Sequence, residues 1–205
     1  MIELLVTLRD RSIYRLEGEG AATVYYLADD DAGGVLINTP HYHAELEARL
    51  AALAPPRFLF YPGRLGAVDV DRWRAATGAE SLAFAAEAEA IEGEVDIVLD
   101  RRSKLTRTID FLPMSGRTPG SGVLRARNLP GVMFFGPVLS PGESGWPTLV
   151  RQPDDFSYED RLFGCLGLQD LRYEYAFTDV FVQGRTRFGP GASRAIRQEI
   201  ERVLV

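Results

Sequence analysis

Histidine and cysteine, which often bind metals or transfer protons and electrons, are scarce in this sequence. The chain has two histidines, His41 and His43, and its turn-rich middle segment contains Ser115 and Ser121. The two histidines could join a carboxylate at a metal ion, but two ligands do not make a site. We interpret His43 as the start of a helix and His41 as a loop residue. No histidine is placed by a motif to activate either serine, so serine hydrolase chemistry is not supported.

Arginine dominates the cationic residues, because Lys104 is the only lysine among 23 basic residues. A guanidinium stays protonated at any working pH and has no lone pair for a metal ion. It binds phosphate, sulfate or carboxylate through parallel N–H bonds. Since arginine is so frequent here, one arginine at one position says little, and only several that meet would form a site.

Two segments have residue patterns similar to those of a metal site. Residues 116–121 have the sequence Gly-Arg-Thr-Pro-Gly-Ser, and residues 132–139 have Val-Met-Phe-Phe-Gly-Pro-Val-Leu. They resemble the motifs Gly-His-Thr-Pro-Gly-Ser and Phe-x-Gly-Asp-x-Leu of the metallo-β-lactamase superfamily, in which the His and the Asp bind metal. Arg117 and Pro137 stand at these two positions, and neither side chain can replace imidazole or carboxylate as a ligand.

The resemblance continues on both sides of these segments. Residues 33–40 are similar to the strand Gly-Gly-x-Leu-Ile-Asp-Thr, with Asn38 in place of the Asp. Residues 62–67 lie where the loop Thr-His-x-His-x-Asp-His is expected. Its three His positions and its Asp position are then occupied by Pro62, Arg64, Ala67 and Gly66. Arg185 stands where the last His of the C-terminal motif Val-x-x-Gly-His-Gly would be.

The resemblance implies an α/β fold, the four-layer αββα sandwich of the superfamily, formed by residues 1–205 as a single domain. A two-metal site of this kind needs about five imidazoles, whereas the chain has two histidines. We therefore expect a degenerate member without a metal or another cofactor. The histidine count also argues against metal-dependent hydrolase activity.

Three of the replaced positions are arginines, and the resemblance implies that Arg64, Arg117 and Arg185 converge on one cleft. Like charges in a partly dehydrated cleft repel each other by several kcal/mol, so they require neutralisation. A bound phosphate, sulfate or carboxylate would supply it, and Tyr61 and Ser115 could add hydroxyl donors.

Internal salt bridges are the alternative to a bound anion. Four carboxylates could provide them: Asp69, Asp71, Asp179 and Glu174. The acidic stretch at residues 87–94, in which alanine and glutamate alternate, is interpreted as a solvated edge or loop and not as a site.

We predict a non-catalytic domain for ligand sensing or protein association, with an arginine-lined anion pocket. Its partner would be a small anion, another protein or a second copy in a homodimer, and an exposed patch near Phe134, Trp146 and Phe156 would support association. One alternative is a metal-independent enzyme that uses the arginines to stabilise a developing anion. The other is a hydrolase of thioesters, lactones or phosphoesters that acts without the usual metal ligands or with relocated ones.

Composition is that of an ordinary globular domain, with 46% hydrophobic and 25% charged residues over 205 positions. The formal charge of −6 and the pI near 5.1 argue against nucleic acid or an anionic membrane as a partner. Neither a membrane span nor a secretory signal is found, so the expected location is the cytoplasm. Cys165 is the only cysteine, and we expect it to pack as a small hydrophobic side chain.

Hydrophobic periodicity predicts alternating strands and helices. The expected strands are residues 2–7, 23–27, 35–38, 58–61, 108–113, 122–126, 131–135 and 179–182. The expected helices are residues 43–53, 69–76, 157–168 and 192–204. A hairpin turn is expected at residues 29–34, and residues 173–177 alternate as in a strand that buries aromatic side chains. Residues 137–153, rich in Pro and Gly, are the best candidate for a mobile loop.

Overall fold

The computed structural model describes residues 1–18 and 20–204. The chain forms two compact units, residues 1–99 and residues 100–205. In the described part, no helix has the length and apolar composition needed to cross a membrane.

Unit 1 is built on a mixed sheet, which has seven strands within the described residues, in the order β1-β2-β3-β4-β5-β6-β7. Strands β1 to β4 are antiparallel neighbours, and β4 to β7 are parallel neighbours. The strands are β1 (Ile2–Thr7), β2 (Arg11–Leu16), β3 (Val24–Asp29), β4 (Gly33–Ile37), β5 (Pro56–Phe60), β6 (Glu80–Phe84) and β7 (Ile97–Leu99). Because parallel neighbours need a crossover, the helices among the described residues of unit 1 follow β4.

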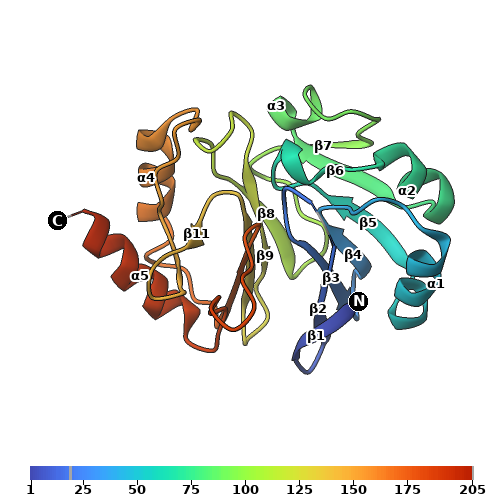
Figure 1. Cartoon of the computed structure of the whole chain (residues 1–205), viewed down its shortest axis with the longest axis horizontal. Coiled ribbons are helices and arrows are strands. Elements are labelled where there is room, and N and C mark those ends of the chain that lie inside the picture. Colours follow the sequence, from blue (N-terminus) through green and yellow to red (C-terminus); the bar gives the residue numbers. More distant parts are fainter. Residues whose placement is uncertain (19, 205) are drawn as a thin grey trace. The chain divides into compact units, whose positions relative to one another are not determined.

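The crossover helices of unit 1 are α1 (Ala44–Leu53), between β4 and β5, and α2 (Val70–Thr77), between β5 and β6; the short helix α3 (Ala85–Ala88) follows β6. A 3₁₀ turn, Arg64–Gly66, lies between β5 and α2. In Figure 1 these helices lie along the seven-stranded sheet. Leu50 of α1 and Trp73 of α2 are fully buried in one cluster with Tyr26, Leu36 and Leu59 from the strands, which ties the helices to the sheet.

Unit 2 has a smaller sheet, which contains four strands within the described residues, in the order β13-β10-β9-β8. These are β8 (Ile109–Pro113), β9 (Gly122–Ala126), β10 (Val132–Gly136) and β13 (Tyr175–Thr178). Strands β8, β9 and β10 are antiparallel, whereas β13 runs parallel to β10. A separate pair, β11 (Ser140–Pro141) and β12 (Pro147–Thr148), lies in the loop after β10.

Residues 100–204 also form two helices, α4 (Tyr158–Leu166) and α5 (Ala192–Val203), and Figure 1 shows both on the same side of the β8–β9 ribbon. Helix α4 begins at Ser157, whose hydroxyl accepts the Asp160 backbone N–H. Cys165 of α4 and Ile196 of α5 are buried in one cluster with Val123 and Met133 of the sheet. The prediction that Cys165 packs as a hydrophobic side chain is confirmed.

The sequence predicted most of these elements but missed β2, β6, β7, the short pair β11 and β12, and the helix α3. The hairpin expected at residues 29–34 joins β3 to β4, as predicted. The strand expected at residues 179–182 is wrong, because residues 175–178 pair with β10 and the chain then leaves the sheet. Val180 and Val182 are 45% and 47% exposed, so these two apolar side chains are not buried as they would be in a strand of the core.

Candidate functional site

The motif at residues 116–121 forms a closed turn after β8. The Met114 N–H donates to the Ser121 carbonyl at 2.9 Å, and the Ser121 hydroxyl donates back to the Met114 carbonyl at 2.8 Å. Ser121 is fully buried. Its hydroxyl therefore closes the turn and is not presented to a substrate.

The turn lies against the start of α4. Gly116 has a φ of +123°, and a Cβ at this position would lie 2.4 Å from the Ser157 carbonyl oxygen and 2.6 Å from the backbone nitrogen of Arg161. The Ser157 N–H donates to the Gly116 carbonyl at 2.9 Å. Only glycine permits this close approach, so the first residue of the motif positions the turn on α4.

Arg117 projects from this turn to two aspartates before α4. Its Nη2 donates to Asp154 Oδ2 at 2.9 Å and its Nη1 to the Asp154 carbonyl at 3.2 Å. Its Nε lies 3.8 Å from Asp155 Oδ1. The guanidinium lowers the pKa of Asp154 below its usual value. Arg117 is thus an internally paired cation.

Asp155 is shared with a second arginine that sequence reasoning missed. The Arg161 side chain is fully buried, and its Nη1 contacts both Asp155 oxygens at 2.7 and 2.6 Å. Nη1 also donates to the Val150 carbonyl, and Nε and Nη2 donate to the Val138 carbonyl. Because Arg161 is in α4 and both carbonyls belong to the loop after β10, this side chain fixes that loop. The proline- and glycine-rich loop at residues 137–153 is accordingly well packed, with Val138, Leu139 and Leu149 buried.

Arg64 begins the 3₁₀ turn after β5 and is held by Glu87 of α3. Its Nε and Nη2 donate to the two carboxylate oxygens at 3.0 and 2.9 Å, and its backbone N–H donates to Oε2 at 2.7 Å. Glu87 is fully buried, whereas the Arg64 side chain is 34% exposed. The bidentate bond to Glu87 raises the pKa of Arg64 above its usual value.

The interpretation of the acidic stretch at residues 87–94 as a solvated edge or loop is wrong for Glu87, because this side chain is fully buried.

Three of the carboxylates that were expected to pair with the arginines of the site bind other groups. Asp69 contacts His41 and Arg72, Asp71 contacts Arg74, and Glu174 accepts the N–H of Gly191. No sequence signal marked Glu87 or Arg161, because alternating alanine and glutamate and a single helical arginine are both common on surfaces.

The other predicted ligand contacts differ in their exposure. Tyr61 is fully buried in the core of unit 1, its hydroxyl lies 3.4 Å from Thr39 Oγ1, and burial raises its pKa. Ser115 is half-buried in the turn before Gly116, and Arg185 is exposed in the segment after β13. Within residues 100–204, Arg185 makes no ion pair.

The histidines do not form a metal centre with their neighbours. His41 is 73% exposed, and its Nδ1 lies 3.3 Å from Asp69 Oδ2. The Tyr42 N–H donates to the same carboxylate, which lowers the pKa of Asp69. Residues 1–18 and 20–204 contain no group of three or more His, Cys, Asp or Glu side chains placed to hold a metal ion. The side chains present therefore do not fit the metal that the resemblance implies.

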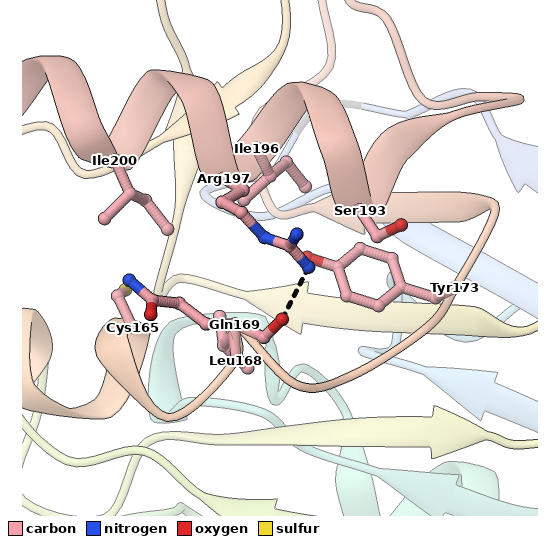
Figure 2. A pocket seen from close by; sticks show the side chains of 8 residues that line it. All are labelled: Cys165, Leu168, Gln169, Tyr173, Ser193, Ile196, Arg197 and Ile200. Atoms are coloured by element: carbon pink, nitrogen blue, oxygen red, sulfur yellow. Dashed lines mark hydrogen bonds between the residues drawn. The ribbon is translucent and has the colours of Figure 1, made fainter.

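A small pocket in unit 2 is too small to be a ligand site. It lies between α4 and α5 and includes Cys165, Tyr173 and Arg197 (Figure 2). Its volume is about 10 Å³, which is room for one water molecule at most. Burial raises the pKa of Cys165 to about 12, so the thiol is not a nucleophile at neutral pH.

The surface patch expected to support association is not formed as predicted. Phe134 is 1% exposed and stacks on Phe177 with ring centroids 5.1 Å apart. Trp146 packs against the core of unit 2. Phe156 is the exposed member of the three, with 60% of its surface accessible to solvent.

Neither the models of known protein families nor the curated protein sequences contain a match to this chain. Solved structures do match its fold. The DIM-1 metallo-β-lactamase superposes with a TM-score of 0.72 at 10% identity, over 98% of each chain. A metallo-β-lactamase from Pontibacter korlensis gives a TM-score of 0.70 at 13% identity, over 98% of this chain and 99% of that one.

A third match is a metallo-β-lactamase from Cronobacter sakazakii described by its HARLDQ motif. It gives a TM-score of 0.61 at 15% identity, over 82% of this chain and 74% of that chain. Identities this low establish the fold and no activity. The chain therefore has the metallo-β-lactamase-like fold, which confirms the predicted fold class.

Proposed function

We propose that this protein is a non-catalytic metallo-β-lactamase-like domain that has lost its metal site and binds an anionic group. The group would be a small phosphate, sulfate or carboxylate compound, or such a group on a protein partner. Two kinds of observation support the loss of the metal. The ligand positions inferred from the resemblance are occupied by residues that cannot ligate, and the described residues contain no alternative ligand cluster.

The name of the Cronobacter sakazakii structure includes a HARLDQ motif. Residues 62–67 of this chain, Pro-Gly-Arg-Leu-Gly-Ala, share Arg and Leu with it at the third and fourth positions.

The orientation of Arg64 is the observation that carries the anion-binding proposal. Glu87 engages Nε and Nη2, and Nη1 is not part of these bonds. The side chain is 34% exposed although its partner is fully buried. A guanidinium fixed from one side in this way presents its remaining N–H edge at little cost in side-chain entropy.

The predicted contacts Arg117, Arg185 and Ser115 belong to unit 2, so the proposed site in unit 1 rests on Arg64 alone. Arg117 is already paired with Asp154, and Arg185 is exposed. Tyr61 is left out of the proposed contacts, because its hydroxyl is buried in the core of unit 1.

Thermal unfolding with a panel of anions tests the proposal. The panel contains inorganic phosphate, sulfate, citrate and a nucleoside monophosphate. A ligand at a hundred times its Kd stabilises the folded state by about 2.7 kcal/mol, which raises the midpoint by roughly 5 to 10 °C for a chain of this size. We expect such a shift for at least one compound.

Two variants show where the anion binds. Arg64→Met/Glu87→Gln removes the proposed donor together with its buried counter-charge, so the variant is not left with an unpaired carboxylate. Arg74→Ala is the control, because Arg74 is also held by carboxylates, Asp96 and Glu94. The shift should be lost in the first variant and kept in the second. No shift for any compound, or a shift that survives in the Arg64 variant, rejects the proposed site.

A further inference from the structure

The loop that precedes β8 has a high density of positive charge. Four of the seven residues from 101 to 107 are basic and exposed: Arg101, Arg102, Lys104 and Arg107. None of these four side chains forms an ion pair with a residue that the structure describes. Unit 2 contains 15 basic and 12 acidic residues, although the whole chain has a formal charge of −6. The charge of the chain is therefore unevenly distributed, and this loop is a local cationic segment.

The loop is held in one conformation by its own hydrogen bonds. At its start, Asp100 Oδ1 accepts the Arg102 N–H at 2.8 Å and the Ser103 hydroxyl at 2.9 Å. At its end, the Thr106 hydroxyl accepts the Ile109 N–H at 3.1 Å, and the Thr106 N–H donates to the Ile109 carbonyl at 3.2 Å. Because the loop is ordered in advance, a partner does not have to restrict its backbone on binding.

A fifth cation and an apolar side chain border this loop. The Arg127 Nη2 donates to the Arg107 carbonyl, and the Arg127 side chain is 43% exposed. Its Nε lies 3.5 Å from Asp110 Oδ2, but that carboxylate already accepts two hydrogen bonds from Arg125. Leu129 follows two residues later and is 76% exposed. We define the basic patch as Arg101, Arg102, Lys104, Arg107, Arg127 and Leu129.

The side chains around the patch favour one kind of anionic partner. Guanidinium groups bind phosphates through parallel hydrogen bonds, and phosphates occur in lipid headgroups and in nucleic acids. Proteins that bind single-stranded nucleic acid stack its bases on exposed aromatic side chains. Residues 100–130 contain one aromatic residue, Phe111, which is 2% exposed. Exposed Leu129 suits the apolar region beneath lipid headgroups instead.

We propose that the basic patch docks this protein reversibly on an anionic lipid surface, with the cations at the lipid phosphates and Leu129 inserted below them. The net charge of the chain argued against such a partner. However, exposed charges are largely screened beyond the Debye length, about 8 Å at physiological ionic strength, so a lipid surface responds mainly to the patch that faces it. Each Lys or Arg near an anionic surface strengthens binding about five-fold.

Co-sedimentation with vesicles tests the proposal. We expect binding to vesicles of phosphatidylcholine and phosphatidylglycerol, no binding to pure phosphatidylcholine, and weaker binding as sodium chloride is added. Lys104→Gln/Arg107→Gln should raise the apparent Kd about 25-fold. Arg151→Gln/Arg202→Gln is the matched control, because it changes the net charge equally at exposed positions before α4 and in the last turn of α5. Its apparent Kd should change by less than about two-fold.

Leu129→Ser distinguishes a lipid surface from other phosphates. It should raise the apparent Kd for the vesicles by roughly three- to ten-fold, and this factor should persist at high salt, because apolar burial is not screened. A single-stranded oligonucleotide is the competing probe. Binding of the oligonucleotide but not of the vesicles would assign the patch to nucleic acid and overturn the proposal.

Two further results would also overturn it. These are the absence of binding to the anionic vesicles, and equal losses in the patch variant and its control. All the substituted side chains are exposed, so thermal unfolding should show midpoints within about 2 °C of the native chain. Arg64→Met/Glu87→Gln should bind the vesicles as the native chain does, so this proposal and the proposed anion site can fail independently.

Discussion

Arg64 in unit 1 and Arg117 in unit 2 each form an ion pair with a carboxylate, but the two carboxylates differ in solvent exposure. Glu87 is fully buried behind Arg64. Asp154, the main partner of Arg117, is 71% exposed. A buried carboxylate loses its solvation and depends on its partner, whereas an exposed one is solvated with or without it. Replacement of the arginine should therefore have very different effects at the two positions.

The buried cation of unit 2 is Arg161. Its side chain is fully buried with Asp155, which is 5% exposed. Arg161 also satisfies two backbone carbonyls of the loop after β10, those of Val138 and Val150. In unit 2 the arginine at the motif position, Arg117, and the arginine that supports the packing, Arg161, are thus two different residues. In unit 1 Arg64 has both roles.

The largest expected effect follows from removing Arg161. Arg161→Met leaves the Asp155 carboxylate without its buried partner and two carbonyls without donors, and the free energy of unfolding should fall by about 3 to 5 kcal/mol. Urea denaturation measures the loss. Adding Asp155→Asn should restore only part of it, because the carbonyls stay unpaired. A loss below about 1 kcal/mol for Arg161→Met would contradict the role of this side chain.

Removing Arg64 should have the second largest effect. Arg64→Met leaves Glu87 buried without a counter-charge, and the partial exposure of Arg64 reduces the expected loss to about 2 to 3 kcal/mol. Adding Glu87→Gln should recover most of this loss, because the neutral amide can still accept the Arg64 backbone N–H. The recovery of stability in the two double variants therefore distinguishes the two arginines. Arg64 in unit 1 mainly pairs with a carboxylate, whereas Arg161 in unit 2 also donates to backbone carbonyls. Equal recovery in both pairs would remove this distinction.

The sequence was sufficient for the parts of the fold that depend on local signals. The turn at residues 116–121 has its glycines and proline at positions that define its backbone, and the hairpin between β3 and β4 follows from its Asp- and Gly-rich turn. Helix α4 begins at a serine, as helices often do. The superfamily resemblance ordered these elements, and the structural matches confirm the resulting fold.

Burial of charged residues could not be predicted in the same way. Glu87 and Arg161 are both fully buried, although each occupies a sequence context typical of solvated helices. Glu87 pairs with Arg64, 23 residues away. Arg161 pairs with Asp155, six residues away, and also donates to the Val138 carbonyl, 23 residues away. The strands β6 and β7 were missed for a related reason. Their character comes from parallel pairing with β5 and with each other, and not from an alternating pattern.

The smallest expected effect is that of Arg117→Gln, and its signature is a change in titration. Asp154 is well exposed, so the thermal midpoint should change by no more than about 2 °C. In the native chain the pKa of Asp154 is lowered, mainly by the Arg117 hydrogen bond. The pair therefore stabilises the fold above about pH 4, the ordinary range of an aspartate. This contribution is lost as the pH falls through the lowered pKa.

Titration of the side-chain carboxyls by NMR measures this change directly. In Arg117→Gln the pKa of Asp154 should rise towards its ordinary value. Asp100 is the matched control, because its pKa is also lowered, but mainly by the Arg102 N–H and the Ser103 hydroxyl within its own loop. Its titration should not change. If Asp154 keeps its lowered pKa without Arg117, the ion pair is not what holds this aspartate. The contrast between the buried carboxylate that pairs with Arg64 and the exposed one that pairs with Arg117 would then rest on Glu87 alone.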